Sequence, residues 1–148
     1  MKAENTTRIQ FDSLSVNEAY ARGAAAAFLA RYDPTVPQLA DLKTAVSEAV
    51  TNCIVHAYPD TVGPITMTAV LYEGGNVRIT ISDKGVGIPD VAKAMEPMYS
   101  QSVRGTERSG MGFCFMEAFM DDLKVSSSVG NGTLVQMKKK ICGGKRTE

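Results

Sequence analysis

The sequence predicts one α/β (α+β) domain, a two-layer sandwich with a mostly antiparallel sheet and helices on one face. The chain has 148 residues, 44% of them hydrophobic and 22% charged, which suits a single soluble domain with its own core. Segments with helical periodicity and segments with period-two alternation follow in the order strand, two helices, hairpin, loop, helix, hairpin. Strands joined by short Gly-containing loops pair as hairpins, which favours an antiparallel sheet. We find no internal repeat and no domain boundary, so the domain is expected to span residues 1–148.

The first predicted element is a short strand near the N-terminus. Ile9 and Phe11 alternate with polar neighbours, as in a half-buried strand. Residues 1–7 are polar and are expected to form a disordered tail, and so are residues 143–148 at the other end.

Two helices are expected to follow this strand. Ser15 and Glu18 have the spacing of an N-terminal capping box, which predicts a helix over residues 16–31. Apolar residues at helical spacing predict a second helix over residues 38–56. The expected apolar face of the first helix consists of Tyr20, Ala24, Ala27 and Phe28. The expected apolar stripe of the second consists of Leu42, Val46, Ala49, Val50 and Cys53.

Two hairpins and a third helix account for most of the remaining chain. Residues 65–72 and 77–82 alternate at period two and are joined by a short loop with two glycines. Residues 123–128 and 133–140 form a second such pair. Residues 113–120 are expected to be helical.

Charge and cysteine usage exclude several classes of function. The formal net charge is zero, which does not favour nucleic acid or an anionic membrane as a partner, and we interpret the run Lys138–Lys140 as a short solvated patch. Cys53, Cys114 and Cys142 are odd in number and form no C-x-x-C pair, which favours free thiols in a reducing compartment. The chain shows no signal-peptide core and no apolar run long enough to span a membrane. We therefore expect a cytoplasmic protein.

Glu48 and Asn52 lie four residues apart on the second predicted helix. Their side chains therefore project side by side, away from the apolar stripe. The amide oxygen can bind a hard cation such as Mg²⁺, and the carboxylate can accept a proton. Taken alone, the pair is explained better as an ordinary solvated helix face.

An irregular, glycine-rich stretch over residues 83–112 separates the two hairpins. Such a long connection in a compact domain usually has a functional reason. It begins with Asp83, at the end of an apolar strand, followed by Gly85 and Gly87. The carboxylate can accept a hydrogen bond from an exocyclic amine, and the glycines let the backbone approach a flat ring. A simple glycine-rich turn explains this segment equally well.

The stretch ends in Arg108-Ser109-Gly110-Met111-Gly112-Phe113, immediately before the third predicted helix. Free backbone N–H groups and the positive end of a helix form a good anion site. The segment is not a Walker A sequence, because no Gly-Lys-Ser/Thr follows, and it is not a Rossmann fingerprint, because a loop rather than a strand precedes it. A plain loop-to-helix junction is an equally good explanation of this turn alone.

The order and spacing of the three segments are more specific than any one of them. E-x-x-x-N on a helix, D-x-G-x-G after a strand, a flexible loop and G-x-G opening a helix resemble the N-box, G1 box, ATP lid and G2 box of the GHKL ATPase and kinase superfamily. Gly132-Thr133, at the start of a late strand, resembles the Gly-Thr that this superfamily places near the adenine. The resemblance covers about residues 9–140 and implies the GHKL (Bergerat) ATP-binding fold.

A narrower resemblance is to the anti-sigma F factors of endospore-forming bacteria. The segments that carry it are Ser47–Asn52, His56–Tyr58, Glu107–Phe113, Met116–Asp121 and Tyr20–Arg22. Members of that family bind ATP, form homodimers, hold the sporulation sigma factor F inactive and phosphorylate a serine of an anti-anti-sigma protein. The resemblance therefore implies a serine protein kinase that is also an anti-sigma factor, with sigma factor F, the anti-anti-sigma factor and a second copy of the chain as partners.

The resemblance also implies roles for single residues. Glu48 would be the general base for the substrate serine, Asn52 would bind Mg²⁺, and Asp83 would accept a hydrogen bond from the adenine N6 amine of ATP. Gly87 and Thr133 would line the base pocket.

The phosphates and the partner surface are assigned in the same way. Gly110, Met111 and Gly112 would donate backbone N–H groups to the phosphates, in the turn that begins at Ser109. Arg108 would reach the γ-phosphate, with Arg104 a weaker candidate, and residues 95–109 would form the lid. Arg22 would lie on the partner-binding surface. The lid centre, residues 99–105, departs from the family, so its contacts stay open.

Four alternatives remain open from the sequence. The sigma factor could belong to a stress response, since related anti-sigma kinases serve one. The chain could sequester a sigma factor and use ATP as a structural ligand, although Glu48 argues against pure binding. A gyrase- or chaperone-type ATPase would carry a long transducer domain, and a sensor histidine kinase would need an acceptor histidine on another helix, whereas His56 follows the E-x-x-x-N motif directly.

Overall fold

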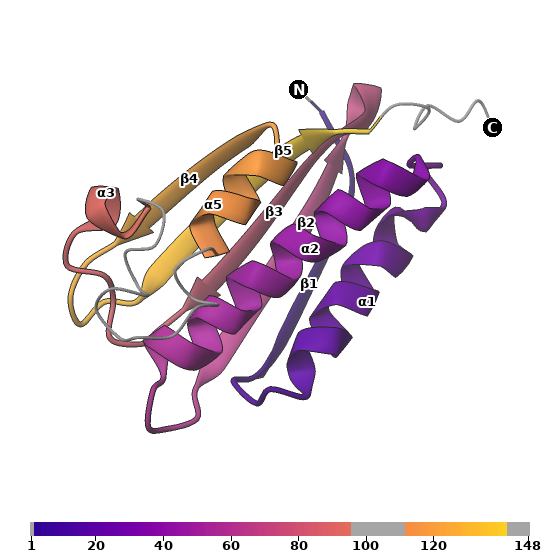
Figure 1. Ribbon diagram of the computed structural model, residues 1–148. Helices are drawn as coiled ribbons and strands as arrows, with labels where there is room; N and C mark the ends of the chain where they lie inside the picture. The colour runs from indigo at the N-terminus through magenta and orange to yellow at the C-terminus, as the bar shows by residue number, and fades with distance from the viewer. Residues whose placement is uncertain (1, 96–111, 142–148) are drawn as a thin grey trace.

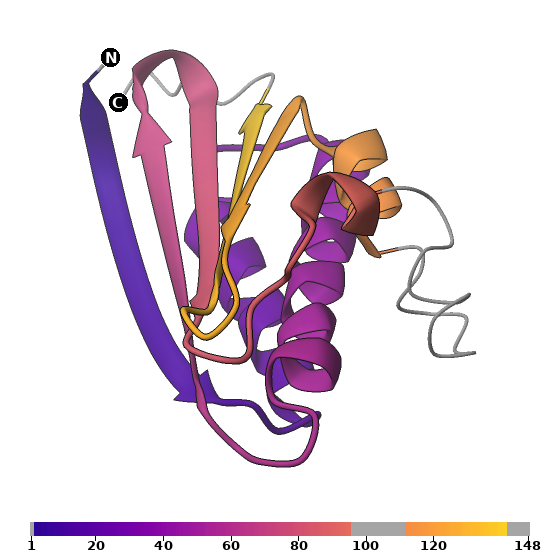
Figure 2. The same ribbon diagram turned by 90° about the vertical axis from the view of Figure 1, so that its left-hand side faces the viewer.

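The computed structural model describes residues 2–95 and 112–141 and has the architecture that the sequence predicts. Its strands form one five-stranded sheet in the order β1-β2-β3-β5-β4, with every neighbouring pair antiparallel. Two views at right angles show α1, α2 and α5 on the same face of this sheet (Figure 1, Figure 2). The elements are β1 (Ala3–Asp12), α1 (Asn17–Ala30), α2 (Val36–Asn52), η1 (Cys53–Ala57), β2 (Pro64–Tyr72), η2 (Glu73–Gly75), β3 (Asn76–Asp83), α3 (Val91–Ala94), α5 (Gly112–Phe119), β4 (Asp122–Ser127) and β5 (Thr133–Lys140).

The N-terminal strand is longer than the sequence predicts, and the expected tail over residues 1–7 is wrong from Ala3 onward. β1 begins at Ala3, which pairs with Tyr72, and continues along β2 to its end. Burial alternates along its polar segment as well, since Asn5 and Thr7 are half-buried while their neighbours are exposed. An edge strand with one solvated face tolerates polar side chains, and the backbone ladder with β2 orders this segment without apolar anchors.

Helix α1 buries a different face from the predicted one. Tyr20, expected inside, is 51% exposed, although the edge of its ring meets Phe11 with the centroids 6.0 Å apart. The buried residues of α1 are Ala21, Ala25 and Leu29. This line is displaced by one residue, about 100° around the helix, from the expected one. Alanines on the contact line let α1 lie close to the neighbouring layer, which a line through Tyr20 does not allow.

Helix α1 also begins without the predicted capping box. It starts at Asn17, and Val16 before it has helical backbone angles and no side-chain cap. The Glu18 amide donates to the Ser15 carbonyl at 3.2 Å, while the Glu18 carboxylate pairs with Arg22 one turn along. The carboxylate is therefore engaged along the helix instead of folding back to its N-terminus.

Helix α2 has the capping box that α1 lacks. The Thr35 hydroxyl accepts from the Gln38 amide at 3.2 Å, and the Gln38 side-chain oxygen accepts from the Thr35 amide at 2.8 Å. The helix begins at Val36, two residues earlier than expected, and its last turn is the π-helical segment η1. The expected apolar stripe of this helix is buried along its whole length. Within the described ranges, no helix is both long and apolar enough to cross a membrane.

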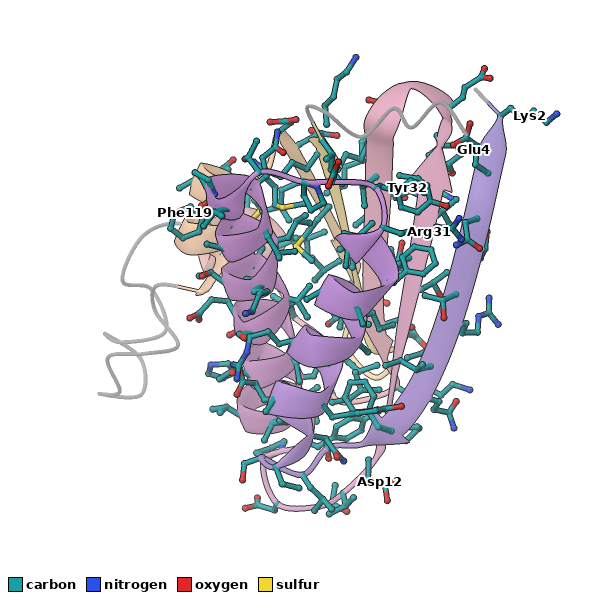
Figure 3. The ribbon with its side chains drawn as sticks, turned by 90° about the vertical axis from the view of Figure 1, so that its right-hand side faces the viewer. Lys2, Glu4, Asp12, Arg31, Tyr32 and Phe119 are labelled. Atoms are coloured by element: carbon teal, nitrogen blue, oxygen red, sulfur yellow. The ribbon has the colours of Figure 1, made fainter. Side chains whose placement is uncertain are left out.

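The core lies between the sheet and the helix layer, where Figure 3 shows side chains filling the space. Every second residue of β3 is buried, from Val77 through Ile79 and Ile81, so these side chains face the helices. The other layer contributes the stripe of α2 and, from α5, Phe113 and Met116. The next position in the β3 alternation is Asp83, which places a carboxylate on the inner face of the sheet.

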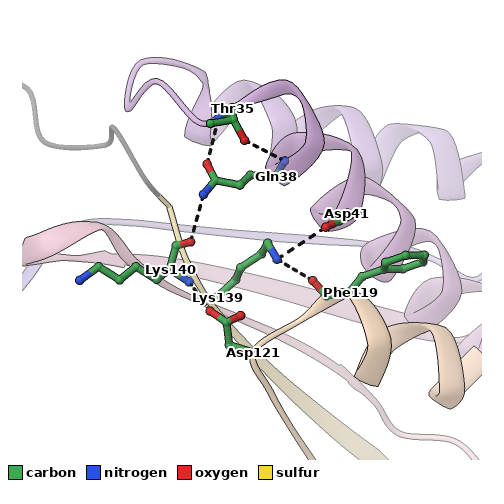
Figure 4. Close-up of polar contacts among 7 residues, drawn as sticks. All are labelled: Thr35, Gln38, Asp41, Phe119, Asp121, Lys139 and Lys140. Carbon is green, nitrogen blue, oxygen red and sulfur yellow. Dashed lines mark hydrogen bonds and ion pairs between the residues drawn. The ribbon is translucent and has the colours of Figure 1, made fainter.

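One lysine of the basic run is not the solvated residue that the sequence suggests. The side chain of Lys139 is 12% exposed, and its Nζ donates to the Phe119 carbonyl at 2.7 Å (Figure 4). Asp41 of α2 lies 3.7 Å from the same nitrogen. Lys139 therefore links β5 to the end of α5 and to α2, whereas Lys138 and Lys140 are exposed as expected.

We expect Lys139→Ala to lower the free energy of unfolding by about 1–2 kcal/mol, because it removes a charge-assisted hydrogen bond from a mostly buried site. Lys138→Ala is the matched control, since the neighbouring side chain is exposed, and it should change stability by no more than about 0.5 kcal/mol. Urea unfolding of the two variants measures both values. Equal losses would show that the linkage contributes nothing.

Candidate nucleotide-binding site

Three of the predicted site residues, Asn52, Asp83 and Thr133, lie at the ends of α2, β3 and β5 that come together. The C-terminal end of α2, the end of β3 and the start of β5 lie together at the lower left of Figure 1. Two hydrogen bonds join them at one carboxylate: Asp83 accepts from Cys53 of η1 and from the Thr133 amide of β5. The fold thus unites segments that lie 30 and 50 residues from Asp83 along the chain.

Asp83 is buried because it continues the inward-facing positions of β3, and 8% of it remains exposed. Its Oδ1 accepts from the Gly85 amide at 2.9 Å and from the Thr133 amide at 3.2 Å. Its Oδ2 accepts from the Cys53 thiol at 3.3 Å. A buried carboxylate needs such donors, and this set fixes its orientation while leaving acceptor capacity on Oδ2.

The glycines around Asp83 are required by packing within the protein. A Cβ on Gly85 would lie 2.2 Å from the Ala57 carbonyl oxygen, and one on Gly87 would lie 2.0 Å from the Ser128 oxygen. Gly87 also has a positive φ of 82°. The close approach expected from these glycines is therefore made to protein backbone, and the role of Gly87 in a base pocket stays a prediction.

Tyr58 ties the loop after β3 to the start of β2. Its hydroxyl donates to the Pro64 carbonyl at 2.7 Å and accepts from the Lys84 amide at 2.7 Å. Burial raises the pKa of the Tyr58 hydroxyl, the bond from Lys84 opposes that rise, and nearby Asp83 adds to it. Gly63 leaves room for the ring, since a Cβ there would lie 2.3 Å from it.

Asn52 is the last residue of α2, directly before Cys53. Its Oδ1 is buried and, among the described residues, has no hydrogen-bond partner. An orphaned buried amide oxygen is unusual, because such groups are nearly always satisfied. This oxygen is a suitable ligand for Mg²⁺, so the residue present fits the expected metal.

Glu48 lies one turn earlier on α2 and is half-buried. It lines a hollow of about 410 Å³ between α1 and α2, together with Arg22, Ser47 and Thr51. Arg22 donates to the Ser47 hydroxyl at 3.1 Å and pairs with Glu18, so it links the two helices instead of extending freely into solvent. The structure thus brings the expected base and the expected partner-binding arginine to one hollow.

Part of the expected phosphate site lies outside the described residues. This applies to Arg104, Arg108, Ser109, Gly110 and Met111 and to nearly all of the expected lid. Gly112 is the first residue of α5, which confirms that a helix begins at this end of the glycine-rich stretch. Helix α5 packs beside α2, with Met116 buried in the shared core.

Three residues at the site were not predicted from the sequence. Cys53 contacts the Asp83 carboxylate, Tyr58 holds the following loop, and the Ser127 hydroxyl accepts from the Ile88 amide at 2.7 Å. Ser127 also lies 2.7 Å from the Thr133 hydroxyl. The one available signal was local: Cys53 directly follows the segment Ser47–Asn52, and Tyr58 is the last residue of the segment His56–Tyr58, although no role was predicted for either. A serine in a strand carries no such signal.

These features define a nucleotide-binding domain of the histidine kinase-like ATPase class, and the family model for the histidine kinase-like ATPase domain matches residues 12–139. Solved structures share the fold: the RsbU and RsbW domains of a Mycobacterium tuberculosis protein superpose with a TM-score of 0.68 at 21% identity, covering 93% of this chain and 33% of that one. The mycobacterial sensor histidine kinase MprB gives 0.56 at 15% identity, covering 91% and 98%.

Curated relatives narrow the class. The anti-sigma F factor of Caldanaerobacter subterraneus subsp. tengcongensis is 49% identical over 141 residues, which is 95% of this chain and 97% of that protein. The anti-sigma F factor of a type E strain of Clostridium botulinum is 52% identical over 93% of this chain and 96% of that protein. The chain belongs to the anti-sigma F factor family. This confirms the resemblance stated from the sequence, and with it an ATP-binding kinase domain of the serine-kinase type.

Proposed function

We propose that this protein holds sigma factor F inactive and transfers the γ-phosphate of Mg-ATP to a serine of an anti-anti-sigma protein. The observation that carries the proposal is that Asn52, whose buried oxygen has no partner among the residues described, and the buried Asp83 lie at one end of the sheet. Two relatives that share nearly the whole chain with this protein are anti-sigma F factors.

Asp83 would recognise the base. Its Oδ1 is occupied by two backbone amides, so the oxygen with acceptor capacity left is Oδ2, and the adenine N6 amine is the donor it would receive. Thr133, whose amide donates to Asp83, would line the same pocket, as would Gly87, which packs against the Ser128 carbonyl. Ser109, Gly110, Met111 and Gly112, together with Arg108, would hold the phosphates at the start of α5.

Glu48 would act on the substrate serine. The serine hydroxyl attacks the γ-phosphorus, the bond to the bridging oxygen breaks, ADP leaves, and the hydroxyl proton passes to the Glu48 carboxylate. Asn52 would hold Mg²⁺, which neutralises phosphate charge when it is bound. Phosphoryl transfer depends mainly on positioning, so Glu48 would orient the hydroxyl as well as accept its proton. The open hollow beside Glu48 gives a protein substrate access to this carboxylate.

Arg22 would contact the protein partners. It lines the same hollow as Glu48, and its side chain is held in place by Glu18 and Ser47. A partner docked there would reach the expected base directly. A homodimer, implied by the family, completes the proposed assembly.

The proposal is tested by incubating the purified chain with γ-labelled Mg-ATP and a candidate anti-anti-sigma protein, and by mapping the phosphorylated residue. We expect label on a serine and retention of sigma factor F by the same preparation. A protein that binds ATP and the sigma factor yet never transfers phosphate would be a sequestering module with ATP as a structural ligand. Retention of only a stress-response sigma factor would reassign the partner.

The metal role of Asn52 makes a separate prediction. Asn52→Ala should weaken binding of Mg-ATP roughly 10- to 100-fold, the cost of losing one interaction with a charged group, while changing binding of metal-free ATP much less. Calorimetry with Mg²⁺ and with EDTA measures the two affinities. Thr44→Ala, two turns earlier on the same line of α2, is the control and should leave both unchanged. Equal losses with and without metal would rule out Asn52 as a ligand.

A further inference from the structure

The Asp83 carboxylate has an unequal set of donors. Oδ1 accepts two backbone amides, from Gly85 and Thr133, at 2.9 and 3.2 Å. Oδ2 accepts one side-chain donor, the Cys53 thiol at 3.3 Å. Each carboxylate oxygen offers about two lone-pair sites, so Oδ1 is filled and Oδ2 has room for one more donor. The oxygen left for a ligand is therefore the one that Cys53 holds.

We propose that Cys53 is a positioning residue for base recognition, whose thiol orients Asp83 so that Oδ2 keeps one acceptor site for the exocyclic amine of adenine. The inference rests on the proposed function, because it assumes that Asp83 receives the base. It adds a residue that acts through Asp83 and that sets the preference for a 6-amino over a 6-oxo purine.

The surroundings of the thiol support this assignment. Cys53 is the first residue of η1 and is 4% exposed in the core. Its Sγ lies 3.3 Å from Oδ2 of Asp83, and in this contact the thiol donates and the carboxylate oxygen accepts. A thiol is also a weak donor, which leaves Oδ2 a good acceptor for a second hydrogen bond.

The position of Cys53 in the chain adds a geometric reason. It follows Asn52 directly, so one end of α2 carries both the expected metal ligand and the residue that holds the base acceptor. The thiol contact is the side-chain link from this helix end to Asp83. Loss of the donor would free the Oδ2 side of the carboxylate without disturbing the amides on Oδ1.

The test compares Cys53→Ala with Cys53→Ser, which are nearly equal in size and differ in the donor. Binding of ATP and of inosine triphosphate, whose base has a 6-oxo group in place of the amine, is measured for both variants and for the unaltered chain with Mg²⁺. We expect the unaltered chain to prefer ATP. Cys53→Ala should weaken ATP binding about tenfold, as for loss of one hydrogen bond to a charged group, and leave inosine triphosphate within about twofold. Cys53→Ser should retain the preference.

Kinase measurements provide a second readout. For Cys53→Ala the KM for ATP should rise with kcat nearly unchanged, because the contact acts on binding of the base in both ground and transition states. If the small variants do not fold, Cys53→Thr and Cys53→Val form a larger pair that again differs in the hydroxyl.

Each outcome decides a different claim. An unchanged ratio of the two affinities in Cys53→Ala, or equal losses for both nucleotides in both variants, would overturn the positioning role and leave the kinase proposal standing. Equal binding of ATP and inosine triphosphate by the unaltered chain would overturn the role of Asp83 itself, and the Cys53 inference with it. Loss of the preference for ATP in Cys53→Ala together with its retention in Cys53→Ser would support both the role of Asp83 and the role of Cys53.

Discussion

Glu48→Gln is expected to lower the rate of phosphate transfer to the substrate serine by about 10²-fold or more, the range for loss of a general base. The amide keeps the size of the side chain but cannot accept the proton. Nucleotide binding should change little, because Glu48 lies one turn of α2 away from Asn52 and lines the hollow shared with Arg22. Single-turnover transfer of labelled phosphate and calorimetry of Mg-ATP binding measure the two effects separately.

Glu73→Gln is a suitable control for this experiment. Glu73 is an exposed glutamate in the turn between β2 and β3, and its replacement by glutamine removes the same charge from the protein as Glu48→Gln does. It should transfer phosphate at the unaltered rate. If Glu48→Gln retained most of its activity, the carboxylate would have no role in the chemical step. If it lost ATP binding to the same extent as activity, Glu48 would belong to the nucleotide pocket instead.

Gly132→Ala is expected to destabilise the protein by about 3–5 kcal/mol, from a strained positive φ together with overpacking. Gly132 has a φ of 80°, and a Cβ on it would lie 2.2 Å from the Asp83 carbonyl oxygen. The obstacle is backbone at the centre of the site, so it cannot turn aside as a flexible side chain would. The same change should also weaken ATP binding, because Thr133, the next residue, donates to the Asp83 carboxylate.

The same turn contains a matched control. Gly130 has nearly the same φ, 82°, but a Cβ there would meet no atom within 4 Å. Gly130→Ala should therefore carry only the cost of the left-handed backbone, about 1–2 kcal/mol. Chemical unfolding of the two variants separates the free-energy cost of the left-handed backbone from the cost of the steric overlap. Equal destabilisation would mean that the backbone around Asp83 adjusts to the added carbon.

The elements were largely predictable because each depends on neighbours along the chain. The stripe of α2 repeats at helical spacing, and the strands of both hairpins alternate around turn-forming glycines. The predicted strand over residues 133–140 matches β5 at both ends. The face of α1 was wrong because an alanine-rich helix offers several apolar lines, and the choice among them depends on what packs against it.

The same distinction between local patterns and distant contacts applies to the functional residues. Glu48, Asn52 and Asp83 were predicted from motif order and spacing, since each motif is a short local pattern. The segment of β1 before Arg8 was missed because pairing with a strand more than sixty residues away orders it. The burial of Lys139 was missed because its partners, Asp41 and Phe119, lie on two helices far away in the sequence.

The sequence by itself therefore determined the fold class and the family, and it predicted which residues carry the expected chemistry. Only the tertiary structure decided how those residues are held: the Cys53 thiol on Asp83, the backbone contact that requires glycine at 132, and the shared hollow of Glu48 and Arg22. The physical reason is the sequence separation of the residues that interact. Periodicity and motifs record interactions within a few residues, whereas the geometry of a carboxylate is set by donors that reach it from 30 and 50 residues away.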